Sequence, residues 1–188
     1  MCPRALILTL LLALSLVTEA NAVPQKLTVT STAFRNGGII PKKFTCFGRG
    51  ISPQIGWSQV PPGTASIVVI LEDLAPDEAG DSGPSKWGIY NIAKNQRSIA
   101  ENFRSSKVGS TINSDGKSGY SRPCNSSSST YSFKVYALNI VLPKSAYKYT
   151  GDLDYELQFN SYSGRVGALF PHILAKGTLN AKYRPFDS

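Results

Sequence analysis

The chain of 188 residues carries 20 Lys and Arg against 12 Asp and Glu, a net charge of +8. This balance favours acidic partners such as phosphate-bearing ligands, anionic membrane surfaces or nucleic acid. The basic residues are spread singly, with Lys42-Lys43 as the only adjacent pair, and no basic run is interleaved with aromatic residues. We therefore expect no nucleic-acid partner, and interpret the charge first as a source of solubility and second as an attraction for anions.

The first 22 residues have the pattern of a secretory signal peptide. Met1 to Arg4 is a short basic start, Ala5 to Val17 is almost wholly apolar, and Ala20-Asn21-Ala22 is an A-x-A cleavage site. The apolar run is shorter than the roughly 20 residues that a membrane-spanning helix needs. We expect cleavage before Val23, a secreted or periplasmic protein without a transmembrane segment, and one domain formed by residues 23–188.

Strand patterns dominate the rest of the chain. Five segments alternate apolar and polar residues or carry β-branched runs, at 26–31, 66–72, 87–92, 131–142 and 177–185. The run at 66–72 is continuously apolar, which indicates a central strand covered on both faces. Helical patterns occur at 153–159 and 164–175. We predict a mainly β fold of two packed sheets with a short C-terminal helical addition.

Two cysteines, Cys46 and Cys124, would remain after cleavage, because Cys2 leaves with the leader. In an oxidising compartment two cysteines usually pair. A disulfide that closes a loop of roughly 80 residues stabilises a fold by about 4–5 kcal/mol in the chain-entropy model. Neither cysteine has a His or Cys partner at metal-ligand spacing, so we predict no metal site and no cofactor.

Five segments of the chain stand together in the order and spacing of a known family. They are "GGIIPKKFTCFGRGISPQIGW", "VPPGTASIVVILEDLAP", "KWGIYNI", "SGYSRPCNSSSSTYSFKVYAL" and "HILAKGTLNAKYRP". Over nearly all of residues 27–184 the chain resembles the phosphatidylethanolamine-binding protein family, in its bacterial-type branch, also called Raf kinase inhibitor-like proteins. The resemblance implies a two-sheet, Greek-key-like sandwich with a small surface pocket for anions such as phosphate esters and phospholipid headgroups.

The resemblance also implies which residues line that pocket. In this chain they are Asp73, Lys86, Trp87, Tyr120, Arg122, Pro123 and Ser129. Several depart from the family pattern. Lys86 and Ser129 stand where the family has histidines, Arg122 stands where it usually has glycine, and the second aspartate of the acidic motif after Asp73 is missing.

Two interpretations of the pocket follow. In the first, Lys86 and Arg122 contact an anion with permanent charge, Ser129 donates a hydroxyl, Asp73 orients Lys86, and Trp87 and Tyr120 form the walls. Such a pocket binds anions without a pH switch in the histidine range. In the second, the pocket has decayed, and Lys86 is a solvated residue that pairs with Asp73. In either case a Cys46–Cys124 disulfide would brace two of the surrounding loops.

No catalytic constellation is present in the sequence. The single histidine, His172, is predicted to be structural, and there is neither a G-x-S-x-G elbow nor a glycine-rich phosphate loop. We expect a non-enzymatic binding protein for a small anionic ligand. The alternative is an inhibitor that binds a secreted protease or surface receptor through a protein interface. Asn125-Ser126-Ser127 is an N-glycosylation acceptor if the source is eukaryotic.

Overall fold

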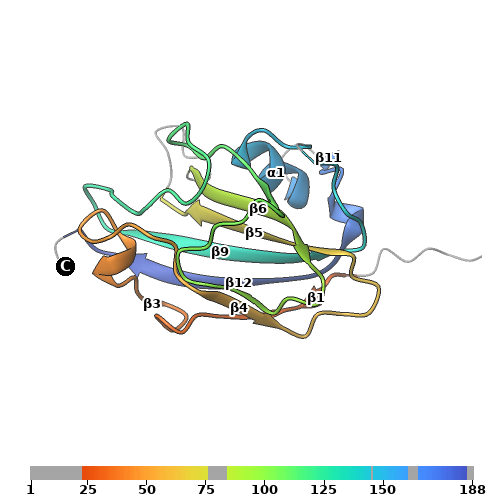
Figure 1. Ribbon diagram of the computed structural model, residues 1–188, viewed down its shortest axis with the longest axis horizontal. Helices are drawn as coiled ribbons and strands as arrows, with labels where there is room; N and C mark the ends of the chain where they lie inside the picture. Colours follow the sequence, from red (N-terminus) through yellow and green to blue (C-terminus); the bar gives the residue numbers. More distant parts are fainter. Residues whose placement is uncertain (1–22, 76–83, 145, 161–164, 186–188) are drawn as a thin grey trace, which may run out of the picture.

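The computed structural model describes residues 23–75, 84–144, 146–160 and 165–185 (Figure 1). The predicted signal peptide lies outside these residues. The elements in chain order are β1 (Gln25–Lys26), β2 (Thr28–Thr30), β3 (Gly38–Ile39), η1 (Lys42–Phe44), β4 (Ile55–Ser58), β5 (Ser66–Asp73), β6 (Ser85–Ala93), β7 (Ser98–Ile99), β8 (Gly109–Ser110), β9 (Ser129–Leu138), α1 (Thr150–Leu157), β10 (Phe159–Asn160), β11 (Arg165–Val166), η2 (Phe170–His172) and β12 (Ile173–Tyr183).

Two main sheets form the body of the molecule. The large sheet has seven strands in the order β1-β12-β9-β5-β6-β8, with β3 also paired to β12. The small sheet has the order β2-β4-β7, and β10 pairs with β11. The expectation of a mainly β, two-sheet fold is confirmed. No helix within the described part of the chain has the length and apolar character needed to cross a bilayer.

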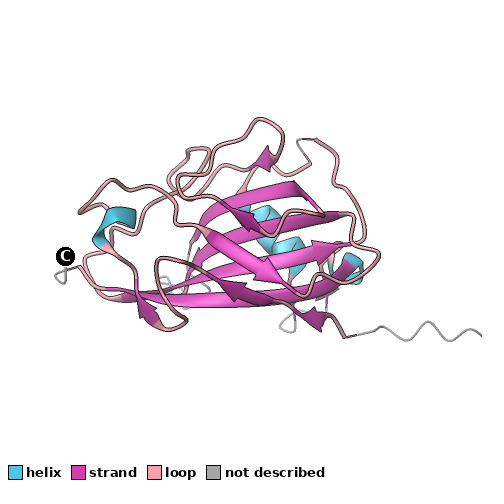
Figure 2. Cartoon of the chain, turned by 60° about the horizontal axis from the view of Figure 1, so that its bottom comes forward, coloured by secondary structure: helices cyan, strands magenta, loops and turns pink. Residues whose placement is uncertain are grey.

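The large sheet is covered on both faces. The first core lies between the two sheets and includes Val29, Ile55 and Trp57 from the small sheet and Val69, Leu71, Phe133 and Leu179 from the large one. The second core lies between the opposite face and α1, and includes Val68, Ile70, Tyr90, Leu153 and Leu157. Figure 2 shows α1 behind the strands of the large sheet. All eight residues of β5 are buried, as predicted for a strand covered on both sides.

Two sequence predictions need correction. The segment 26–31 is not one strand: β1 pairs with β12 in the large sheet, whereas β2 pairs with β4 in the small one. The second predicted helix, 164–175, is wrong. Its described part contains β11, the short η2 and the start of β12, whose buried and exposed residues alternate from Ile173 to Tyr183. That period of two fits a strand with one buried face. The first predicted helix is present as α1, shifted to Thr150–Leu157.

The disulfide joins two loops at one end of the large sheet. Cys46, after η1, is bonded to Cys124, before β9, with 5.3 Å between their Cα atoms. The Cys46 amide also donates to the Pro123 carbonyl at 3.1 Å. The predicted pairing is therefore confirmed, and it fixes the segment that carries Tyr120 and Arg122 against the η1 loop.

Candidate functional site

Most of the predicted site residues lie at one end of the large sheet. The strand β5 ends at Asp73, while β6 begins at Ser85 and β9 begins at Ser129. Both pairings are antiparallel, with Glu72 opposite Ser85 and Asp73 opposite Tyr131. An antiparallel pair brings the end of one strand beside the start of the next. The sheet topology thus gathers residues that are far apart in sequence.

At this end of the sheet, the Asp73 side chain accepts hydrogen bonds from three uncharged donors. Its side chain is 1% exposed. Ser129 Oγ donates to Oδ1, Asn125 Nδ2 donates to Oδ2 at 2.6 Å, and the Ala75 amide donates to Oδ1 at 3.1 Å. Hydrogen bonds of this kind stabilise a buried carboxylate without a cation. Asp73 pairs with no cation within the described ranges.

Two tyrosines complete this cluster, and the sequence reasoning did not include them. Tyr131 is fully buried, and its hydroxyl makes no hydrogen bond to any described residue. Burial, and secondarily the nearby Asp73 carboxylate, raise the pKa of Tyr131, so the phenol stays neutral. Tyr183 packs edge-on against it at 6.1 Å and donates to the Asn125 carbonyl at 3.1 Å. The available signal was the position of Tyr131 two residues after Ser129 in the family motif.

Lys86 belongs to a second cluster, apart from Asp73. Its Nζ lies 3.6 Å from Asp115 Oδ1, and its side chain is only 13% exposed. Ser121 Oγ donates to the other oxygen of Asp115. The Ser121 hydrogen bond and the Lys86 charge hold the pKa of Asp115 below its ordinary value. The expectation that Asp73 orients Lys86 is therefore wrong.

The strand geometry explains this separation. Successive residues of a strand point to opposite faces of the sheet. Trp87 packs in the core between the two sheets, on the face that also holds Leu71 and Phe133. Its neighbour Lys86 therefore points to the other face, toward Asp115.

Arg122 is exposed and is held near the disulfide. Its side chain lies over Gly50, so close that a Cβ added at residue 50 would be 2.5 Å from Arg122 Cδ. Gly50 also has φ +63°, a conformation that favours glycine. The next residue, Pro123, is buried and accepts the Cys46 amide. Arg122 forms no ion pair or side-chain hydrogen bond with any residue that the structure describes.

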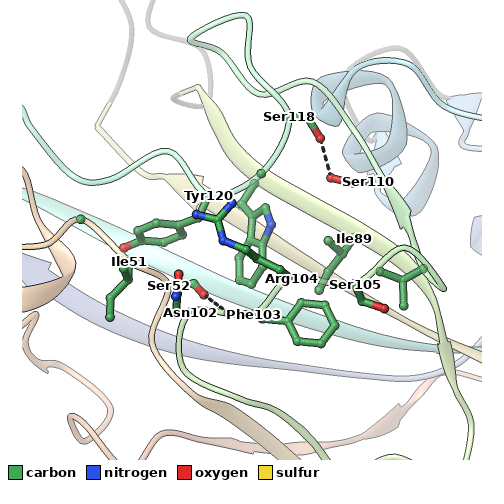
Figure 3. A pocket seen from close by; sticks show the side chains of 14 residues that line it. Ile51, Ser52, Ile89, Asn102, Phe103, Arg104, Ser105, Ser110, Ser118 and Tyr120 are labelled. Carbon is green, nitrogen blue, oxygen red and sulfur yellow. Dashed lines mark hydrogen bonds between the residues drawn. The ribbon is translucent and has the colours of Figure 1, made fainter.

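A cavity of about 270 Å³ lies beside Trp87 and Tyr120 (Figure 3). The two rings meet edge to face at 5.7 Å, and Tyr120 donates its hydroxyl to the Phe44 carbonyl at 3.0 Å. Burial of that hydroxyl end raises the pKa of Tyr120. Gly50 lines one lip, and Phe103 with Arg104 lines another. No motif in the sequence pointed to Phe103 or Arg104.

A larger hollow of about 690 Å³ lies near Ser129, on the side of the 127–130 segment and the end of β12. The seven predicted site residues are thus divided among several places. Asp73 and Ser129 share one cluster, Lys86 has Asp115 as its partner, Trp87 and Tyr120 wall the smaller cavity, and Arg122 with Pro123 lies on the disulfide-linked loop.

The comparisons with known proteins decide the family. The model of the family described as phosphatidylethanolamine-binding protein matches residues 30–184. The chain belongs to this family. A UPF0098 protein of Aquifex aeolicus is 40% identical over 119 residues, which cover 60% of this chain and 68% of that protein. A putative lipoprotein, LppC, of Mycobacterium tuberculosis is 31% identical over 121 residues, which cover 63% of this chain and 58% of that protein.

Solved structures agree with this family assignment. The putative phosphatidylethanolamine-binding protein homologue CT736 of Chlamydia trachomatis has a TM-score of 0.68 and 31% identity, over 85% of this chain and 98% of that one. YbcL of E. coli, described as a member of the mammalian family, has a TM-score of 0.69 over the same shares at 22% identity. The YbcL match supports the fold alone.

Proposed function

We propose that this member of the family is an exported, non-enzymatic binding protein for a small anionic ligand, a phosphate ester or a phospholipid headgroup. The observation that carries the proposal is the state of Arg122. Its guanidinium is exposed, has no acidic partner among the described residues, and stands two residues before the disulfide-bonded Cys124. A free guanidinium is suited to phosphate because its planar donors match two phosphate oxygens.

The loop around Arg122 supports this role. The Cys46–Cys124 bond and the Cys46 to Pro123 hydrogen bond hold the loop in place. A cation on a fixed loop loses less conformational entropy when a ligand binds than one on a free loop. Lys86 lies at the start of β6 and faces Asp115. In this proposal Lys86 also contacts the anion, after its ion pair with Asp115 has opened.

Three observations support export and the absence of catalysis. A disulfide persists in oxidising compartments, and one relative is described as a putative lipoprotein. His172 Nδ1 lies 2.9 Å from Asn139 Oδ1, just beyond the end of β9. Ser129 begins the same strand, so the single histidine lies at the far end of the sheet from the predicted site. This position supports a structural role for His172.

The second candidate function is binding of a protein partner, a secreted protease or a surface receptor. It is favoured by Phe47, which is 44% exposed on the disulfide-linked loop next to Cys46. Exposed aromatic residues on fixed loops are common anchors of protein interfaces.

Calorimetric titration of the oxidised protein tests the anion proposal, with inorganic phosphate and O-phosphoethanolamine as probes. We expect Arg122→Gln to weaken binding of both probes by about tenfold, the usual scale for one charge-assisted contact. Arg35→Gln is the matched control, because Arg35 is also exposed and lies between β2 and β3. Equal binding by both variants, or no binding by the parent protein, would overturn the proposal. Incubation with phosphate esters should release no phosphate.

A further inference from the structure

We infer that the cavity walled by Trp87 and Tyr120 receives a planar apolar group of the ligand, with Arg104 as a second contact for its anion. The inference rests on the proposed function and names its ligand class: phosphate esters with an aromatic ring, in preference to free phosphate or a headgroup alone. The cavity volume of about 270 Å³ is close to the lower end of the range for small-ligand pockets. It suits one ring.

The walls of the cavity are held in place before any ligand arrives. Trp87 is 1% exposed and belongs to the core between the sheets. Tyr120 is fixed at its hydroxyl by the Phe44 carbonyl and at its ring by Trp87. Such fixed walls add no ordering cost when a ligand binds, and the aromatic surface open to the ligand comes from the partly buried Tyr120 and Phe103 rather than from Trp87.

The lips of the cavity are also tied to each other. The Ser52 carbonyl accepts the Asn102 amide at 2.8 Å, and Ser52 Oγ accepts the Phe103 amide at 3.0 Å. Asn102 has φ +54°, a left-handed conformation that non-glycine residues rarely adopt. This bend directs the segment that carries Phe103 and Arg104 along the cavity.

The positive charge of Arg104 at the cavity favours an anionic group on the ligand. Arg104 is exposed, lines the cavity, and has no hydrogen-bond or ion-pair partner in the described part of the chain. In Figure 3 its side chain runs over the cavity in the direction of Tyr120. Arg122 is not among the lining residues, but its side chain lies over Gly50, which is. One guanidinium group without an acidic partner thus lines the cavity and a second lies against one of its lining residues, and both charges would attract an anion there.

These features together define the ligand. The phosphate would lie at the mouth against Arg104 and Arg122, and the ring would enter between Trp87, Tyr120 and Phe103. Burial of one ring adds apolar contact that inorganic phosphate and O-phosphoethanolamine lack. We expect phenyl phosphate to bind about tenfold or more tightly than either of them.

Calorimetry and fluorescence test the inference on the oxidised protein. The chain has two tryptophans, and Trp57→Phe leaves Trp87 as the only one. Phenyl phosphate should then change the tryptophan emission at saturation, while inorganic phosphate should not. Because Trp57 is itself a core residue, the same comparison is made by calorimetry in the parent protein.

Two substitutions with matched controls locate the ring and the anion. Val108→Phe narrows the cavity from its lining and should remove the preference for phenyl phosphate while phosphate still binds. Val141→Phe is its control, because Val141 is 64% exposed and lies outside this cavity. Arg104→Gln should weaken phenyl phosphate by about tenfold, whereas Arg35→Gln should not.

The outcomes separate the two proposals. Equal affinity for phenyl phosphate and inorganic phosphate in the parent protein, with unchanged Trp87 emission, would overturn the inference and leave the proposed anion binding intact. A preference that survives Val108→Phe would also overturn it. Failure of every probe to bind would remove the proposed function and the inference with it.

Discussion

Ser129 donates its hydroxyl proton to the buried carboxylate of Asp73, across 56 residues of sequence. Family members are expected to carry a histidine at this position, whose charge changes near neutral pH. A serine hydroxyl has no such titration, and the Asn125 amide that shares Asp73 has none either. The side chains that donate to Asp73 therefore carry no charge that changes in the histidine range.

Ser129→Ala should destabilise the fold, because it removes one donor from a buried carboxylate. We expect a loss of about 1–3 kcal/mol in the free energy of unfolding, measured by urea denaturation. Ser128→Ala is the control, since Ser128 is exposed on the same segment and has no hydrogen bond to a described residue. Equal losses in both variants would show that Asp73 does not depend on the Ser129 hydroxyl.

Asp115→Asn should strengthen binding of inorganic phosphate. The change removes the carboxylate that faces Lys86 at 3.6 Å and leaves the lysine available to an anion. We expect an increase in affinity of roughly threefold to tenfold, corresponding to a contact of about 1 kcal/mol. Asp152→Asn makes the same change in net charge at an exposed position in α1 and should have little effect. A similar increase in both variants would assign the effect to net charge alone.

Glu72→Gln should alter the pH dependence of stability. Glu72 is 4% exposed, and Lys134 Nζ lies 2.7 Å from its Oε2. Burial raises the pKa of Glu72 above 4.5 in spite of Lys134. The folded state therefore keeps this proton to higher pH than the unfolded state, so the stability that Glu72 contributes is full below 4.5 and declines as pH rises through the raised pKa.

The measurement is the free energy of unfolding of the parent protein and of Glu72→Gln, from below pH 4.5 upward through the raised pKa of Glu72. The parent should lose stability relative to the variant as pH rises. Glu101→Gln is the control, because Glu101 is also paired with a lysine, Lys43 at 2.7 Å, but is exposed. A gap between the parent and Glu72→Gln that stays constant with pH, or widens in favour of the parent, would contradict the prediction.

Removal of the disulfide should lower stability and weaken anion binding together. Cys46 and Cys124 are 78 residues apart, so the loss approaches about 4–5 kcal/mol in the chain-entropy model. The double variant Cys46→Ser, Cys124→Ser should melt at a lower temperature and bind inorganic phosphate more weakly, because the Arg122 loop is no longer fixed. Reducing agent should reproduce both effects in the parent protein and change nothing in the double variant. Unaltered phosphate binding in the reduced protein would show that the anion site does not depend on the disulfide-fixed loop.

The sequence predicted the strands best where the side chains alone determine them. The segments of β5 and β9 carry continuous or alternating apolar residues because these side chains are buried in the sheet, and both strands are present. The predicted helix at 164–175 failed because apolar residues around Pro171 fit a helical period as well as the start of a strand. Only the pairing of Ile173 with Leu138 on β9 distinguishes the two, and that pairing is a tertiary contact.

The sequence named several residues that lie at this end of the large sheet, but not their partners. The family motifs identified Asp73, Ser129, Lys86 and Trp87, and the structure brings the first two together. The partner of Lys86 could not be read from the sequence, because it depends on which face of β6 each residue takes and on where the loop with Asp115 returns. Arg104 lies in no motif, and its place at the cavity follows from the Ser52 hydrogen bonds.

The last strand of the chain lies inside the large sheet, between β9 and the N-terminal β1. Residue 25 pairs with residue 175, so β1 finds its partner only when the end of the chain is available. Contacts over such separations form slowly, because the intervening chain must first be closed into a loop. A chain that ends at residue 170 therefore lacks the strand that joins β1 and β3 to β9, and the large sheet can be completed only after the last part of the chain has been made.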